Sequence, residues 1–203
     1  MFTGMIQHRS RVENLSQRKG ILMAVVQKPK GLRAMRGASI AVNGICSTVT
    51  KITSTSIAFE YMPETLRKTN IGKLRVDNIV NIETSLTPAS LLDGHLTMGH
   101  VDTVGRIANI AREGSARTFT VTMPKTFLTY IAPKGSVAME GVSLTVVHKT
   151  SQGFSVSLIP YTLSHTNLGT KEVGDAVNIE CDILAKYLHE MVGIRHNAKR
   201  RAR

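Results

Sequence analysis

An internal duplication is the feature of this 203-residue sequence that most limits how it can fold. The segments MPETLRKTNIGKLRVDNIVNIE (62–83) and IPYTLSHTNLGTKEVGDAVNIE (159–180) align without a gap at an offset of 97, and 11 of their 22 positions are identical. GASIAVNGICSTVT (37–50) aligns with KGSVAMEGVSLTVV (134–147) at the same offset, and residues 4–6 match residues 99–101 at an offset of 95. Two copies of a domain of about 90 residues therefore make up most of the chain.

Each copy has the pattern of short β-strands. Alternating or β-branched runs, such as residues 39–49 and 79–82, are interrupted by Gly, Asn and Asp turn residues. A domain this short buries one face of its strands and removes its edges most simply by closing into a small barrel. We therefore expect an all-β chain with domains at residues 1–90 and 91–182, joined through a polar segment around residues 84–94 that contains Pro88.

The strand pattern stops at Asp182, and a helical pattern follows in residues 183–203. Apolar residues recur along one helical face, with Asp182 as a candidate N-cap and Gly193 as a candidate end: Ile183, Leu184, Tyr187, Leu188, Met191 and Val192. Such a stripe either docks on a barrel or mediates self-association, and we favour self-association because both barrels are already complete. Residues 197–203 are expected to be a disordered basic tail.

The formal net charge of +12 is concentrated at the two ends of the chain. Residues 1–36 hold eight Lys/Arg and one acid, residues 195–203 hold five Lys/Arg and no acid, and the remaining 158 residues carry 13 of each sign. A nucleic-acid-binding domain carries basic residues and aromatics through its folded body, whereas only 4% of this chain is aromatic. Binding of nucleic acid is therefore not expected as the main role.

Composition also favours a cytoplasmic protein. No apolar run approaches the about 18 residues of a membrane span, and the N-terminus lacks a secretory pattern. The acid-poor, Arg-bearing start leaves a transit peptide open as an alternative. The two cysteines, Cys46 and Cys181, form no disulfide framework and no metal-binding cluster, which indicates a reducing compartment.

Several ordered motifs carry a resemblance along the whole chain: MFTG at the start, SIAVNGIC-TVT, PETLRKTNIG, GH-TMGHVD, KGSVAMEGVSLTV, and VNIECDILAKY at the close. Together they resemble the riboflavin synthase family, whose members are built from lumazine-binding repeats. Three features depart from the family pattern: Ser47 stands where Leu is usual, Asp93 stands where a second Gly commonly precedes Gly94-His95, and the basic tail is extra. Because Ser47 adjoins Cys46, it bears on the shape of the pocket.

The resemblance implies two similar six-stranded antiparallel Greek-key barrels and a C-terminal helix that helps to form a homotrimer. It implies the conversion of two molecules of 6,7-dimethyl-8-ribityllumazine into riboflavin and a pyrimidinedione, at a site shared between the N-terminal barrel of one protomer and the C-terminal barrel of another. No metal, nucleotide or redox cofactor is implied, and the sequence has no GxGxxG, P-loop, HExxH or GxSxG motif. Whether a lumazine synthase shell associates with the enzyme is left open.

The resemblance also assigns residues to the two pockets. The catalytic candidates are Cys46, His100, Ser143 and Asp182. The N-terminal pocket is expected to include Thr3, Ser39, Cys46, Thr48, Met62 and Thr65. The C-terminal pocket is expected to include Lys134, Ser143, Thr145, Ile159, Thr162 and Asp182. Gly4 is also expected to bind substrate.

Taken singly, these residues have simpler explanations. Ser39 and Thr48 can be solvent-facing strand residues, and Cys46 can be a small buried hydrophobe. A lone histidine such as His100 or His95 is most often structural, and Asp182 can be a helix cap. The competing function is a non-catalytic lumazine- or flavin-binding antenna of the same fold, and the identity of the nucleophile, Cys46 or water, is left open.

Overall fold

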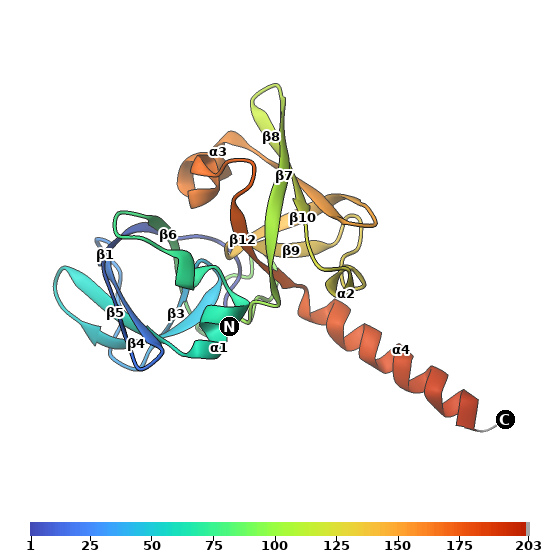
Figure 1. The fold of residues 1–203 in the computed structure, drawn as a ribbon, viewed down its shortest axis with the longest axis horizontal. Helices are drawn as coiled ribbons and strands as arrows, with labels where there is room; N and C mark the ends of the chain where they lie inside the picture. Colours follow the sequence, from blue (N-terminus) through green and yellow to red (C-terminus); the bar gives the residue numbers. More distant parts are fainter. Residues whose placement is uncertain (202–203) are drawn as a thin grey trace.

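Six strands of each repeat close into a barrel, as a computed structural model shows for the backbone of residues 1–201 and the side chains of residues 1–192 (Figure 1). The first barrel has the strand order β1-β2-β5-β4-β3-β6. Its strands are β1 (His8–Arg18), β2 (Ile21–Gln27), β3 (Ser39–Val42), β4 (Ile45–Ile52), β5 (Ser56–Tyr61) and β6 (Ile79–Thr84).

The second barrel repeats that order as β7-β8-β11-β10-β9-β12. Its strands are β7 (Thr103–Glu113), β8 (Ala116–Thr122), β9 (Ser136–Met139), β10 (Val142–Lys149), β11 (Gly153–Leu158) and β12 (Ala176–Cys181). All strand pairs are antiparallel. The expected all-β class with two six-stranded Greek-key barrels is confirmed, and the expected boundary at residues 90 and 91 lies between β6 and β7.

Each barrel has its own apolar core, because alternate residues of every strand point inward. In β2, for example, Leu22, Ala24 and Val26 are buried while Met23 is exposed. The register shifts at matching places in the two barrels, between Val12 and Asn14 in β1 and between Ile107 and Asn109 in β7. Such bulges bend long strands so that a small sheet can close.

Short helices connect the strands at equivalent positions. α1 (Pro63–Lys68) and η1 (Ile71–Lys73) follow β5, and α3 (Pro160–His165) and η2 (Asn167–Thr170) follow β11, while α2 (Lys125–Leu128) belongs to the second barrel. Proline opens α1 and α3, where the missing N–H costs no hydrogen bond. No helix in the described part of the chain has both the length and the apolar character that crossing a membrane requires.

The barrels meet at their β3–β4 and β9–β10 hairpins. Gly44 and Gly141 both have a positive φ, and a Cβ on either one would lie less than 3 Å from the backbone nitrogen of the other. This close approach therefore requires glycine on both sides.

A buried polar network surrounds that contact and follows the pseudo-twofold relation between the repeats. Asn81 Nδ2 donates to the Glu140 carbonyl, and Asn178 Nδ2 donates to the Asn43 carbonyl. Asn43 Oδ1 accepts from the Asn81 backbone, and Glu140 Oε1 accepts from the Asn178 backbone. The two repeats differ at one position of this network, where the first has the amide of Asn43 and the second has the carboxyl of Glu140. Burial raises the pKa of Glu140.

The C-terminal helix α4 (Ile183–Arg201) extends away from the second barrel (Figure 1). Asp182 caps it as expected, because its Oδ1 accepts from the Leu184 backbone N–H at 2.9 Å. Lys186 fixes the first turns by pairing with Asp102 at 2.7 Å, and the His189 ring packs edge-on against Tyr130.

Two expectations for this helix are wrong. Gly193 does not end it, and residues 197–201 are helical rather than disordered. A glycine in a helix interior costs only about 1 kcal/mol, and good helix formers such as Ala198 and Lys199 follow. Residues 202–203 of the expected tail lie outside the described residues.

The apolar stripe of α4 does not dock on a barrel of its own chain. Leu184, Tyr187, Leu188 and Met191 are each about 60% exposed or more. Self-association through this stripe remains a prediction.

Candidate functional site

The predicted serine, threonine and cysteine residues of the strands lie on the outer face of each barrel, whereas Thr3 is buried before β1 and was expected in the N-terminal pocket. In the first barrel, Ser39 pairs with Thr48 across β3 and β4, and Ala41 pairs with Cys46. Because neighbouring residues in a strand point to opposite faces, the residues between them turn inward and are buried. The second barrel repeats the arrangement, with Thr145 opposite Ser136 and Ser143 opposite Ala138.

The chain segments that precede the barrels cross over to complete these faces. The Gly99 carbonyl, which precedes the second barrel, accepts from the Cys46 backbone N–H of the first barrel at 2.8 Å. The Gly4 carbonyl accepts from the Ser143 backbone N–H of the second barrel, also at 2.8 Å. Gly4 therefore lies against the second barrel, at Ser143. His100 is exposed and directly follows Gly99, the residue that contacts Cys46.

Two buried carboxylates hold the crossing segments. Glu83 Oε1 accepts from the backbone N–H and the hydroxyl of Thr3, and Oε2 accepts from the Gly4 N–H. Glu180, its equivalent at the end of β12, accepts from the Met98 and Gly99 N–H groups. Burial raises the pKa of both carboxyls, although these hydrogen bonds oppose the rise. Sequence reasoning missed these residues, although both copies of the long repeated block end in Glu.

Glycine is required at both crossing points. Gly4 and Gly99 have φ values of +76° and +74°. A Cβ on Gly4 would lie 2.7 Å from the Ser143 Cβ, and a Cβ on Gly99 would lie 2.7 Å from the Cys46 Cβ. Each glycine therefore lets the backbone lie directly against the side chain expected to react.

On the second barrel, Ser143 has a histidine partner. His95 Nδ1 lies 2.7 Å from Ser143 Oγ, and His95 Nε2 is buried without a hydrogen-bond partner among the described residues. Burial lowers the pKa of His95, while the charge of nearby Asp182 opposes that shift. The imidazole is therefore neutral at neutral pH and can accept a proton. Sequence reasoning treated His95 as structural; the GH pair preceding the His100 motif was its available signal.

Ser47, one of the departures from the family pattern, points into the core. Its side chain is buried, donates to the Ile45 carbonyl at 2.8 Å and lies 2.9 Å from the Tyr61 hydroxyl. Burial raises the pKa of Tyr61, which is therefore a neutral phenol that can share this hydrogen bond. Ser47 therefore faces the core of the first barrel, where its hydroxyl shares a hydrogen bond with Tyr61, and it does not line the outer face.

The remaining predicted residues lie outside the strands. Met62 and Ile159 are 58% and 60% exposed and precede α1 and α3, which carry Thr65 and Thr162. Lys134 has a φ of +68°, whereas its equivalent in the first barrel is Gly37. A non-glycine residue rarely adopts this left-handed conformation, so Lys134 carries backbone strain that Gly37 does not.

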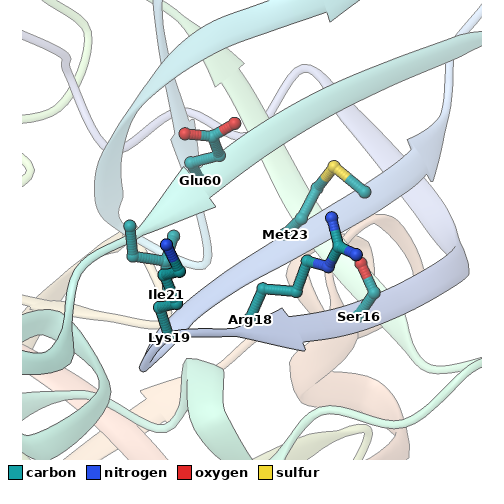
Figure 2. A pocket seen from close by; sticks show the side chains of 6 residues that line it. All are labelled: Ser16, Arg18, Lys19, Ile21, Met23 and Glu60. Atoms are coloured by element: carbon teal, nitrogen blue, oxygen red, sulfur yellow. The ribbon is translucent and has the colours of Figure 1, made fainter.

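Several of the predicted residues, among them Thr48, Met62 and Ile159, are exposed. None of the predicted residues lines any of four hollows on the described part of the molecule. The hollow drawn in Figure 2, of about 600 Å³, lies on the outer side of β1, β2 and β5 and combines Arg18 and Lys19 with Glu60 and the apolar Ile21 and Met23. No group of three or more His, Cys, Asp or Glu in the described residues is arranged to hold a metal ion.

Comparison with known proteins gives a consistent result. The family model of the lumazine binding domain matches twice, at residues 3–85 and 98–182. The chain is 35% identical to a riboflavin synthase of Actinobacillus pleuropneumoniae, over 95% of this chain and 90% of that protein. It is 38% identical to a riboflavin synthase of Escherichia coli (strain K12), over 90% and 87% of the two chains.

Solved structures agree with the fold. The protein LumP in complex with riboflavin superimposes with a TM-score of 0.82 at 27% identity, covering 89% of this chain and 99% of that one. LumP in complex with 6,7-dimethyl-8-(1'-D-ribityl) lumazine gives a TM-score of 0.81 at 25% identity, covering 89% and 98% of the two chains.

Proposed function

The chain belongs to the riboflavin synthase family of lumazine-binding proteins, and from that premise we propose that it converts two molecules of 6,7-dimethyl-8-ribityllumazine into one riboflavin and one 5-amino-6-ribitylamino-2,4(1H,3H)-pyrimidinedione. The reaction transfers a four-carbon unit between two identical molecules. Two related binding faces in one chain suit that stoichiometry.

The observation that carries the proposal is a chemical difference between two otherwise equivalent faces. Cys46 and Ser143 occupy the same position of the repeat, and each is contacted by the carbonyl of a crossing glycine. Of the two, Ser143 alone has a neutral histidine at hydrogen-bond distance among the residues whose side chains the structure describes. The same molecule can thus bind both faces while meeting a thiol at one and a hydroxyl–imidazole pair at the other.

The proposed chemistry needs orientation and proton transfer. Fixing two reactants in a productive encounter can lower a barrier by roughly 7–11 kcal/mol. We assign the Ser143–His95 pair to the removal of a proton from the C7 methyl group of one lumazine. At the other face, Cys46 or a water beside it adds to the second lumazine, and His100 borders that site. Asp182 acts through its charge on His95 while it caps α4.

We propose that each complete site forms between two protomers of a homotrimer. The exposure of Met62, His100 and Ile159 supports this, since a lumazine bound beside them on an isolated protomer would be open to water. The exposed apolar stripe of α4 supplies a surface for assembly. Association with lumazine synthase and a cytoplasmic location remain predictions.

The second candidate is a non-catalytic lumazine- or flavin-binding protein, favoured by the overlap with LumP. The unequal reactive groups of the two faces and the riboflavin synthase relatives favour the enzyme.

A direct assay separates the two candidates. Pure protein incubated with the lumazine alone, in buffer containing a metal chelator and no nucleotide, should form riboflavin, measured by its absorbance and fluorescence. Tight lumazine binding with no riboflavin formed would instead establish the antenna function.

A further inference from the structure

A cleft between the two barrels lies apart from the proposed substrate faces. It has a volume of about 580 Å³ and is lined by the first residues of β1 and by the outer side of α3. Figure 1 shows α3 on the side of the second barrel that faces β6, the strand that pairs with the start of β1. Ile159 and Thr162, the substrate-binding candidates of this region, do not line the cleft.

The cleft has a positive lining. Arg9, Arg11, His8 and His165 line it, and no acidic side chain does. Arg11 pairs with Asp77 at its edge, with both side chains largely exposed, so that pair is weak. Arg9 is exposed and has no ion pair or side-chain hydrogen bond among the described residues. Its guanidinium is therefore available for a bidentate contact with a phosphate.

An aromatic stack forms the opposite wall. The Tyr161 and His165 rings stack with centroids 4.0 Å apart and an interplanar angle of 17°, and Tyr161 is 66% exposed. His165 Nδ1 lies 2.9 Å from the Tyr161 carbonyl, to which it can only donate, and this contact holds the imidazole against the phenol. An exposed ring held in place in this way offers a π-face to a planar ligand.

The equivalent position on the other side of the molecule lacks this chemistry. By strand register and repeat offset, Val104 replaces Arg9, Thr103 replaces His8 and Glu64 replaces Tyr161. Glu64 places a carboxylate where Tyr161 has its ring, and it pairs with Arg67 and Lys68 of its own helix. The arginine and the aromatic platform therefore occur together in one inter-barrel cleft only, within the described residues.

We propose that this cleft binds a planar heteroaromatic phosphate of about mononucleotide size. The ring stacks on Tyr161, and the phosphate is held by Arg9 with support from His8 and His165. The volume lies within the range of about 300–1,000 Å³ that is usual for small-molecule sites. The site is separate from the proposed lumazine faces, so the inference goes beyond the proposed function.

Equilibrium dialysis of the full chain with FMN and with AMP tests the proposal, in the presence of excess riboflavin, which has the flavin ring but no phosphate. We expect binding of at least one of the two phosphates at up to one molecule per chain, weakened by salt. Arg9→Ala and Tyr161→Ala should each weaken it about tenfold or more, as expected for the loss of a charged contact or of a stacking surface. The relative affinities of FMN and AMP identify the ring class.

Two control variants make the test specific. Tyr161→Phe keeps the aromatic face, and Arg106→Ala removes the arginine that occupies the position of Arg11 in the second barrel. Both should bind as the wild type does. Displacement of FMN and AMP by riboflavin, or equal weakening by Arg9→Ala and Arg106→Ala, would overturn the proposal.

Discussion

The two barrels have the same strand order, the same bulges and the same crossing contact, yet they differ at several equivalent positions on their outer faces and at the barrel contact. Cys46 corresponds to Ser143, Gly37 to Lys134, and Asn43 to Glu140. Replacing a residue on the outer face or at the barrel contact leaves the two closed cores untouched. A duplicated domain can therefore keep one architecture while its two faces take up different parts of one reaction.

The largest expected effect comes from breaking a crossing contact. Gly99→Ala should lower turnover about 10²-fold, because the added Cβ would overlap the Cys46 side chain and displace it. A displacement of about 1 Å at a reacting group can cost about 10²-fold in rate. Gly31→Ala is the matched control, since Gly31 has a similar positive φ of +78° but open space around it. That control should lose some stability and keep its turnover. Steady-state kinetics and thermal unfolding of both variants check this, and equal turnover in the two would refute the positional role.

A second effect should follow from removing the assembly surface. Leu188→Asp places a charge in the apolar stripe of α4, and a buried interface anchor is worth about 2 kcal/mol or more. The variant should shift toward monomer and lose most of its turnover. Glu190→Ala, on the same helix but outside the stripe, is the control. Light scattering measures the mass; a wild type that is monomeric and fully active would contradict the shared site.

The buried network gives a smaller effect, visible in the pH dependence of stability. Because burial raises the pKa of Glu140 in the folded state, the folded protein retains a proton that the unfolded chain releases near its ordinary pKa of 4.5. The contribution of Glu140 to the free energy of unfolding therefore falls as pH rises from about that value toward the folded pKa, and stays low above it.

Glu140→Gln cannot ionise, so its stability relative to the wild type should improve with rising pH over that window. Glu83 and Glu180 titrate in both proteins and cancel in the difference. Asn43→Asp is the mirror variant, and it should become less stable relative to the wild type as pH rises. Urea unfolding between pH 4 and 8 measures both trends; a pH-independent difference for Glu140→Gln would show that the pKa of the carboxyl is the same in the folded and unfolded protein.

The smallest expected effect concerns Lys134. Lys134→Gly removes the strain of a left-handed lysine but adds freedom to the unfolded chain, so the free energy of unfolding should change by less than about 1 kcal/mol. Affinity for lumazine should fall if the ammonium group contacts the ligand. Gly37→Lys, the reciprocal change in the first barrel, should cost up to about 1 kcal/mol of stability. Denaturation and ligand titration check both variants, and a loss of several kcal/mol in Lys134→Gly would mean that Lys134 is a packing residue.

Much of the architecture follows from the sequence because the repeat and the alternation of apolar residues specify closed barrels of known length. The Asp182 cap was also predictable, since its side chain acts on the adjacent turn. Gly193 misled because a single helix-breaking residue is weak against the helix formers that follow it.

The contacts of the predicted site residues were not predictable from the repeat. Glu83, Glu180 and His95 act through contacts between segments far apart in the chain, and no periodicity reports such contacts. The crossover has a practical consequence, because a first barrel cut at residue 92 would lack Gly99, whose carbonyl accepts from the Cys46 backbone.

The central claim is that one catalytic site combines the Cys46 face of one protomer with the Ser143 face of another. Complementation tests it most directly. Cys46→Ala and Ser143→Ala are each expressed alone and then together with different affinity tags, and turnover is measured on mixed oligomers that carry both tags. Each variant alone should bind lumazine and be nearly inactive, whereas every mixed trimer should regain about one of its three sites, because one interface then joins an intact Cys46 face to an intact Ser143 face. Mixed oligomers as inactive as their parents would place both faces of the site within a single chain and contradict the account.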